Sequence, residues 1–156
     1  MFNLIKKYRR KRISAQPFPE EWKAILLEKV VHYKYLDQEE KELLELLIKF
    51  FIAEKNFEGC GGLEMNDEIR VVISAQACLL VLALPPFQYA GLDSVLVYPT
   101  TVRLPPQNPG VFSVTPSIVP DQQLLLGQAW LHGPVILVWD AVVRDARHPE
   151  RGHNVV

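Results

Sequence analysis

Six side chains of this sequence are of the types that bind soft metal ions such as zinc. Their spacing matches no common metal-binding pattern, because no Cys-x-x-Cys pair occurs. His148 and His153 are five residues apart with a proline between them, so they do not share one helical face. Residue types and spacing therefore predict no zinc site within this chain. The six residues are His32, His132, His148, His153, Cys60 and Cys78.

Other signatures of catalysis are also missing from the sequence. It contains no Gly-x-Ser-x-Gly turn that would expose a nucleophilic serine. Gly59, Gly61 and Gly62 are not followed by the Lys-Ser/Thr pair of a phosphate-binding loop, so we interpret them as a tight connection between helices. Cys78 lies in an apolar run, where a thiol is usually inert. These residues alone indicate a globular domain without a visible active site.

The first twelve residues are strongly basic. They contain six Lys or Arg residues and no acidic residue, so they carry a charge of +6, and the remainder of the chain carries −7. Apolar residues among the cations would suit an anionic lipid or a nucleic acid. A run this short has little specificity, and we favour a solvated, mobile extension over residues 1–16 with no direct nucleic-acid partner.

Export and membrane insertion are not expected. The opening sequence MFNLIKKYRRKRI lacks the apolar core of a secretory signal. The most apolar run, IRVVISAQACLLVLAL at 69–84, includes Arg70 and is shorter than the about 20 residues that span a bilayer. We interpret it as a buried helix. The two cysteines are expected to be free thiols in a cytoplasmic protein.

Three segments of the first half have the periodicity of amphipathic helices. They are residues 17–31, residues 36–55 with a capping box of Asp37 and Glu40, and a helix that starts after Asn66 and ends before a pair of prolines. We expect their inner faces to share one core. Its predicted members are Trp22, Leu47, Phe50, Ile73 and Leu80.

The second half is predicted to form a small sheet. Ten of the twelve prolines lie from Pro85 to Pro149, which excludes long helices there. Runs rich in β-branched residues remain between the prolines and read as strands. We therefore expect an α+β fold, with N-terminal helices followed by a small sheet, in one unit over residues 17–156. The predicted strands are at 94–99, 111–119 and 134–143.

Four motifs, taken in order, resemble one known family. They are FPEEW at 18–22, KNFEGCGGLEMNDEIRVVISAQACLL at 55–80, VLVYP at 95–99 and GQAWLHGPVILVWDAV at 127–142. Together they closely resemble the Mlc titration factor A family of bacterial zinc peptidases, over nearly all of residues 17–156. The resemblance implies a fold related to the zincin metallopeptidases.

In that family a segment like GHNVV at 152–156 leads directly into a His-Glu-x-x-His helix, whose histidines bind zinc and whose glutamate is the general base. The resemblance thus implies that this chain is the N-terminal portion of such an enzyme and ends just before the motif. No catalytic residue or metal ligand is then expected within this chain, which is expected to bind no zinc and to be inactive alone. Whether the chain itself is an enzyme stays open.

The family further implies a cytoplasmic, aminopeptidase-like enzyme that acts on peptides and also binds the glucose-responsive repressor Mlc. The chain would supply scaffold and cleft wall. The alternative is a non-catalytic module that titrates such a repressor and so affects sugar-uptake genes, and apolar surface left uncovered would favour self-association.

One strand is a candidate for contact with the peptide substrate. The resemblance places residues 134–139 shortly before the metal-binding helix, where zincins pair substrate backbone with an edge strand. A central core strand is the competing interpretation. The candidate residues are Val135, Ile136, Leu137, Val138 and Trp139.

Overall fold

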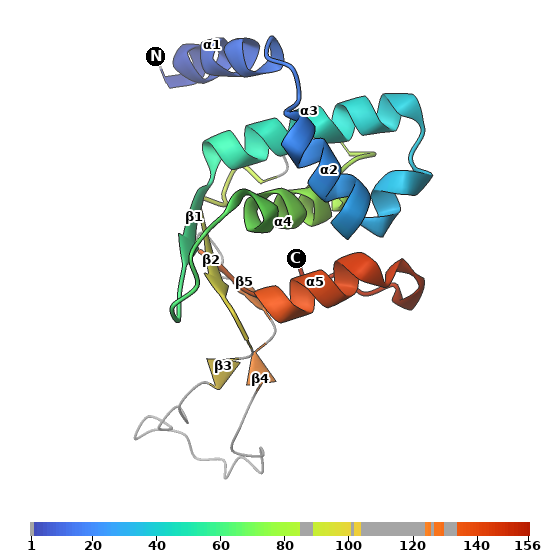
Figure 1. Cartoon of the computed structure of the whole chain (residues 1–156). Coiled ribbons are helices and arrows are strands. Elements are labelled where there is room, and N and C mark those ends of the chain that lie inside the picture. Colours follow the sequence, from blue (N-terminus) through green and yellow to red (C-terminus); the bar gives the residue numbers. More distant parts are fainter. Residues whose placement is uncertain (1, 85–88, 101, 104–123, 126, 130–133) are drawn as a thin grey trace.

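Helices form most of the first half of the chain (Figure 1). The computed structural model describes residues 2–84, 89–100, 102–103, 124–125, 127–129 and 134–156. The helices within these residues are α1 (Phe2–Ser14), α2 (Glu20–Lys29), the 3-10 helix η1 (Val31–Tyr35), α3 (Gln38–Glu54), α4 (Asp67–Leu80), α5 (Trp139–Arg147) and the 3-10 helix η2 (Pro149–Arg151).

Helices α3 and α4 begin at the side-chain caps that the sequence predicts. Asp37 Oδ1 accepts a hydrogen bond from the Glu40 amide at 2.8 Å, and Glu40 Oε2 accepts one from the Asp37 amide at 3.0 Å. This reciprocal pair confirms the capping box of α3. Asn66 Oδ1 accepts a hydrogen bond from the Ile69 amide at 2.9 Å, which confirms the N-cap of α4.

A four-stranded sheet lies beside the helices, in the order β1-β2-β6-β5. Strands β1, β2 and β6 run parallel, β5 is antiparallel to β6, and β3 and β4 form a separate antiparallel pair. Helix α4 lies in the crossover between β1 and β2, as a parallel pair requires. The bounds are β1 (Asn56–Gly59), β2 (Ser94–Tyr98), β3 (Val102–Arg103), β4 (Leu124–Leu125), β5 (Gly127–Ala129) and β6 (Val135–Val138).

Helix α4 is the centre of the hydrophobic core. Every residue from 71 to 78 is buried, because α2, α3 and α5 all pack against this helix. Figure 1 shows α4 between α3 and α5. An apolar helix that is covered on all sides is a core helix, as predicted for this run. Within the described residues, no helix is long and apolar enough to cross a membrane.

The predicted core is confirmed in part. Ile73 is fully buried, and Trp22 and Leu47 are partly buried against the core. Leu80, the last residue of α4, is 53% exposed, and the prediction for it is wrong. Phe50 is half-buried and does not belong to the core cluster.

The inner positions of α3 form a different stripe from the predicted one. Leu44, Ile48 and Phe51 are buried, at the spacing of one helical face. Phe50 lies instead beneath the Arg10 guanidinium of α1, whose centre is 5.4 Å from the ring centroid. This aromatic ring is thus covered by α1 and not by the core.

The strand predicted at 134–143 is only half a strand. Residues 135–138 form β6, but the chain then turns directly into α5, so the prediction is wrong from Trp139 onward. Ala141, Val142 and Ala146 are buried at helical spacing, which a local excess of β-branched residues concealed. The strand at 94–99 corresponds to β2. The strand predicted at 111–119 lies outside the described residues.

The basic N-terminal segment has a defined position. Residues 2–14 form α1, which lies along α3 (Figure 1). The structure thus shows a helix packed on α3 where the sequence indicates an extension, and the mobility of this segment stays a prediction. Taken together, the helices and the mainly parallel sheet confirm the α+β fold.

Candidate functional site

The C-terminal segment, residues 152–156, is anchored between α4 and α5. Gly152 has a φ of 61°, a left-handed conformation that favours glycine, and it ends η2. Beyond it the Asn154 side-chain amide donates to the backbone oxygen of Gln76 in α4 at 3.2 Å. The Val155 amide donates to Asp145 Oδ2 in α5 at 2.9 Å. The segment is thereby tied to both helices.

The two valines that end this segment are partly buried against the core. Val155 and Val156 pack against the core, and the Val156 amide donates to Asn154 Oδ1 at 3.0 Å. The side-chain amide group of Asn154 therefore donates to α4, while its side-chain oxygen accepts from the segment itself. This arrangement fixes the direction of the backbone at residue 156.

Asp145 is the charged residue that holds this anchor in place. Its side chain is 7% exposed, whereas the Arg144 side chain beside it is 49% exposed, and Arg144 Nε lies 3.7 Å from Asp145 Oδ1. Buried carboxylates are costly unless hydrogen bonds and opposite charge compensate them. Here the hydrogen bond from the Val155 amide supplies most of that compensation, and the exposed guanidinium adds little.

Gln76, whose backbone oxygen accepts from Asn154, also carries a buried polar side chain. Its side chain is 1% exposed, and neither its amide nitrogen nor its oxygen has a hydrogen-bond partner among the described residues. Only the backbone oxygen of Gln76 accepts a hydrogen bond from the segment, from the side-chain amide of Asn154. A buried amide of this kind is a strong hydrogen-bonding group, because leaving it unpaired costs about 1–3 kcal/mol.

The expected substrate strand is not an edge strand. β6 pairs with β2 on one side and with β5 on the other, with Leu137 opposite both Val97 and Gly127. Hydrogen bonding on both sides leaves its backbone no free edge for a peptide, so this expectation is wrong. Trp139 is also not in the strand, because it is the first residue of α5.

The candidate metal ligands are scattered through the fold. His153 is exposed, His148 Nδ1 lies 3.0 Å from Glu150 Oε1 at the surface, and His32 is half-buried in η1. His132 lies outside the described residues. No group of three or more His, Cys, Asp or Glu residues in the described part of the chain could hold a metal ion.

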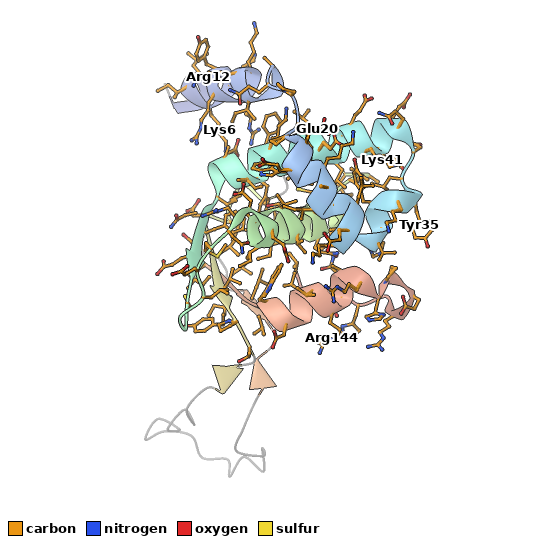
Figure 2. The ribbon with its side chains drawn as sticks, viewed as in Figure 1. Lys6, Arg12, Glu20, Tyr35, Lys41 and Arg144 are labelled. Atoms are coloured by element: carbon orange, nitrogen blue, oxygen red, sulfur yellow. The ribbon has the colours of Figure 1, made fainter. Side chains whose placement is uncertain are left out.

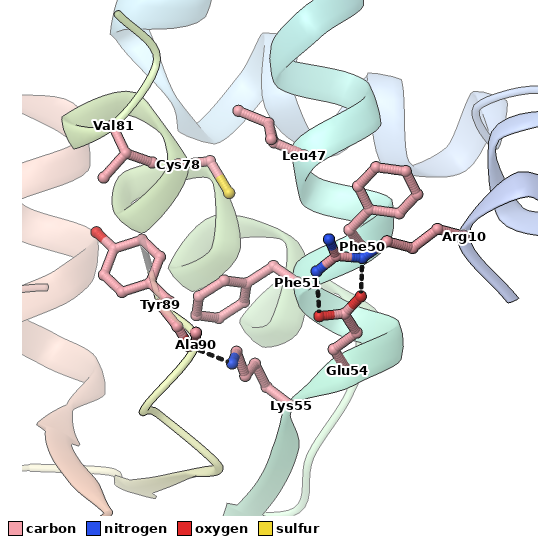
Figure 3. A pocket seen from close by; sticks show the side chains of 10 residues that line it. All are labelled: Arg10, Leu47, Phe50, Phe51, Glu54, Lys55, Cys78, Val81, Tyr89 and Ala90. Carbon is pink, nitrogen blue, oxygen red and sulfur yellow. Dashed lines mark hydrogen bonds and ion pairs between the residues drawn. The ribbon is translucent and has the colours of Figure 1, made fainter. Parts of the chain in front are cut away.

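A cavity of about 50 Å³ lies where α1, α3 and α4 meet the residues before β2 (Figure 3). Phe51 and Tyr89 line it with ring centroids 5.5 Å apart, and Lys55 Nζ donates to the Tyr89 backbone oxygen at 2.5 Å. Burial raises the pKa of the Cys78 thiol in its wall to about 12, so this thiol stays protonated. The cavity is small, and its cysteine is not a nucleophile at neutral pH.

The residues that form the anchor could not be identified from sequence motifs. Gln76 and Asn154 lie in the family-like segments at 55–80 and 152–156, but no motif assigns a role to them or to Asp145. A signal for Asp145 exists, since it is the acidic residue within the otherwise apolar stripe of Ala141, Val142 and Ala146.

Comparisons with known proteins agree with the resemblance found in the sequence. The chain is 33% identical over 151 residues to the uncharacterized protein slr2042 of Synechocystis sp. (strain PCC 6803). This similarity covers 96% of the chain but 54% of that protein, so the chain spans about half the length of its relative.

A family profile covers almost the same part of the chain. Residues 5–156 match the family described as "Glucose-regulated metallo-peptidase M90", the family of Mlc titration factor A, which confirms the resemblance. Because the match includes nearly every residue, the chain belongs to the glucose-regulated metallopeptidase family M90.

Proposed function

We propose that this chain is the N-terminal scaffold of a zinc-dependent, aminopeptidase-like peptidase, and that its C-terminal segment sets the start of a His-Glu-x-x-His helix. The observation that carries the proposal is the anchor at residues 154–156, which ties the backbone to α4 and α5 through Gln76 and Asp145. Family membership and a relative of about twice the length support it. The proposed location is the cytoplasm.

The anchor suits this role for a physical reason. Two histidines on one helical turn hold a metal only if the helix is fixed to within a fraction of an ångström. A helix that continued from Val156 would begin on a backbone held by three hydrogen bonds and two packed valines. The zinc, when bound in the longer protein, would activate a water molecule for peptide hydrolysis.

We assign the cleft wall to the β5 end of the sheet. Among the described residues, β5 (Gly127–Ala129) pairs only with β6. A peptide backbone could therefore pair with the edge of β5 that faces away from β6. β6 continues directly into α5, which carries Asp145. The substrate edge and the anchored segment are therefore connected through one strand and one helix.

The test compares this chain with the proposed longer protein, in which the sequence continues beyond Val156. Zinc content is measured by elemental analysis and activity with chromogenic aminopeptidase substrates. We expect stoichiometric zinc and turnover only in the longer protein, and loss of turnover there when the glutamate of the motif is changed to glutamine. Stoichiometric zinc with turnover in the 156-residue chain, or a longer protein without the motif, would contradict the proposal.

We also propose a second role, in which the chain binds a Mlc-like transcriptional repressor. The description of the family as glucose-regulated supports it. A pull-down of the repressor with this chain tests the idea, since capture is expected if the binding surface lies within residues 1–156. No capture by this chain, with capture by the longer protein, would assign the surface to the other half.

Self-association of this chain is a related proposal. Leu80 and Leu84 are each 53% exposed near the end of α4, and apolar surface of this kind favours association. Size-exclusion chromatography with light scattering should show a dimer or larger species at high concentration. A strictly monomeric chain would contradict this proposal without affecting the peptidase assignment.

A further inference from the structure

The inner face of α1 is fixed on α3 by charged contacts. Arg10 forms a two-point ion pair with Glu54, with Nη2 to Oε2 at 2.7 Å, and Lys6 Nζ lies 3.3 Å from the same carboxylate. Figure 2 shows Lys6 on the side of α1 toward α3. From the opposite direction, Lys49 Nζ of α3 donates to the backbone oxygens of Ile13 at 3.1 Å and of Gln16 at 2.6 Å. The helix therefore has a fixed rotation about its axis.

This rotation exposes three large apolar side chains. Leu4 is 72% exposed, Ile5 64% and Tyr8 75%, and they are among the most exposed large apolar residues in the described part of the chain. Leu4 and Tyr8 are four residues apart and so lie on one face. Packing within this chain therefore does not explain why apolar residues occupy these three positions.

Three basic side chains accompany them. Lys7, Lys11 and Arg12 are exposed and form no ion pair within the described residues, in contrast to Lys6 and Arg10. We call the following set the outer face of α1. It consists of Leu4, Ile5, Lys7, Tyr8, Lys11 and Arg12.

The combination of cations and exposed aliphatic groups points to one chemistry. We propose that the outer face of α1 binds anionic lipid surfaces, with its basic groups at the headgroups and its apolar side chains in the interfacial layer. Leu4 and Ile5 would make no favourable contact with the phosphodiester backbone of a nucleic acid. A bilayer interface, in contrast, can accommodate both basic and aliphatic side chains. The proposal is independent of the peptidase function.

The charge distribution gives this contact a direction. The first acidic residue of the sequence is Glu20, and all of the excess negative charge, −7, lies after residue 12. An anionic surface therefore attracts α1 and repels the remainder of the molecule. The helix lies at one end of the fold, on the far side of α3 from α4 and α5, so it can make contact alone (Figure 1).

The test is co-sedimentation of this chain with vesicles of phosphatidylcholine alone or mixed with phosphatidylglycerol. We expect binding to the mixed vesicles, weakened by salt, and little binding to phosphatidylcholine. The variant Lys7→Gln, Lys11→Gln, Arg12→Gln should bind the mixed vesicles on the order of a hundredfold more weakly, because each basic group near an anionic surface contributes about fivefold.

A matched control removes the same charge elsewhere. Lys23, Lys34 and Arg151 are exposed and lie outside α1, and their triple change to Gln should leave binding within about threefold of the unchanged chain. A third variant, Leu4→Ser, Ile5→Ser, Tyr8→Ser, keeps the charge and should also lose binding. All of these positions are exposed, and circular dichroism checks that each variant folds.

Three results would overturn the proposal. The first is equal binding to both kinds of vesicle, and the second is an equal loss in the outer-face and control variants. The third is a chain that does not bind anionic vesicles but uses α1 to bind another partner. That partner would be a DNA or RNA oligonucleotide, or a second copy of the chain detected by light scattering.

Discussion

Removing the carboxylate of Asp145 should destabilise the protein and release the C-terminal segment. The substitution Asp145→Ala deletes the acceptor for the Val155 amide, which lies 2.9 Å from Oδ2, in a side chain that is 7% exposed. The Val155 amide then stays part-buried without a partner, unless the segment moves. Either outcome separates residues 154–156 from α5.

The size of the effect follows from the contact that is lost. A hydrogen bond to a charged group contributes about 1.5–3 kcal/mol, and the exposed Arg144 adds little because its charge is screened by water. We expect the free energy of unfolding to fall by about 2–3 kcal/mol, or Tm by roughly 4–12 °C for a chain of this size. Asp145→Asn keeps an oxygen acceptor and should lose less.

The assay is urea unfolding followed by circular dichroism, together with amide hydrogen exchange at residues 154–156. Asp140→Asn is the control, since Asp140 is an exposed acid in the first turn of the same helix and should cost no more than about 1 kcal/mol. If Asp145→Ala were no less stable than this control, the anchor would contribute nothing and the reasoning would fail. In the proposed longer protein the same substitution should lower zinc content.

Three further outcomes are expected. Burial opposes ionisation of Glu54, but the hydrogen bond and charge of Arg10 outweigh it and hold the pKa of that carboxyl below its usual value. The ion pair therefore stabilises the contact of α1 with α3 above about pH 4.5, and this stabilisation is lost as the pH falls through the lowered pKa. Hydrogen exchange should then show α1 separating from α3 in acid. The variant Glu54→Gln should show no such pH-dependent step. Gly59→Ala should destabilise the chain by more than about 2 kcal/mol in urea unfolding, because its Cβ would lie 1.9 Å from a backbone oxygen of the following loop. A thiol reagent at pH 8 should modify half-buried Cys60 well before Cys78, whose pKa burial raises to about 12; equal rates by mass spectrometry would contradict the burial of Cys78.

Local signals explain which elements could be predicted from the sequence. The capping box of Asp37 and Glu40 and the N-cap of Asn66 act within four residues, so they locate the starts of α3 and α4 without knowledge of the fold. By contrast, the sequence around Gly59 predicts only a glycine-rich connection. The four residues of β1 become a strand only by pairing with β2, as in Asn56 opposite Ser94, and this contact is distant in sequence.

The end of β6 shows a different limit. The run from Val135 through Val143 is rich in β-branched residues, so local preference favours one long strand. The structure divides it at Val138 because Ala141, Val142 and Ala146 can all reach the core only with helical spacing. Tertiary packing thus overrides local preference, and the same division moves Trp139 from the predicted substrate strand into a helix.

The anchor could not be predicted because its meaning depends on burial. Asp145 and Gln76 are ordinary polar residues in the sequence, and only the fold places one on each side of residues 152–156. If this region served packing alone, apolar side chains would fill it without the cost of burying a charge and an unpaired amide. The buried carboxylate of Asp145 is better explained by a need to fix backbone direction, because it accepts the Val155 amide, whereas the Gln76 side chain makes no hydrogen bond among the described residues. In the proposed peptidase that direction determines where the metal-binding turn begins, so the stability of the anchor and the geometry of the zinc site would depend on the same hydrogen bonds.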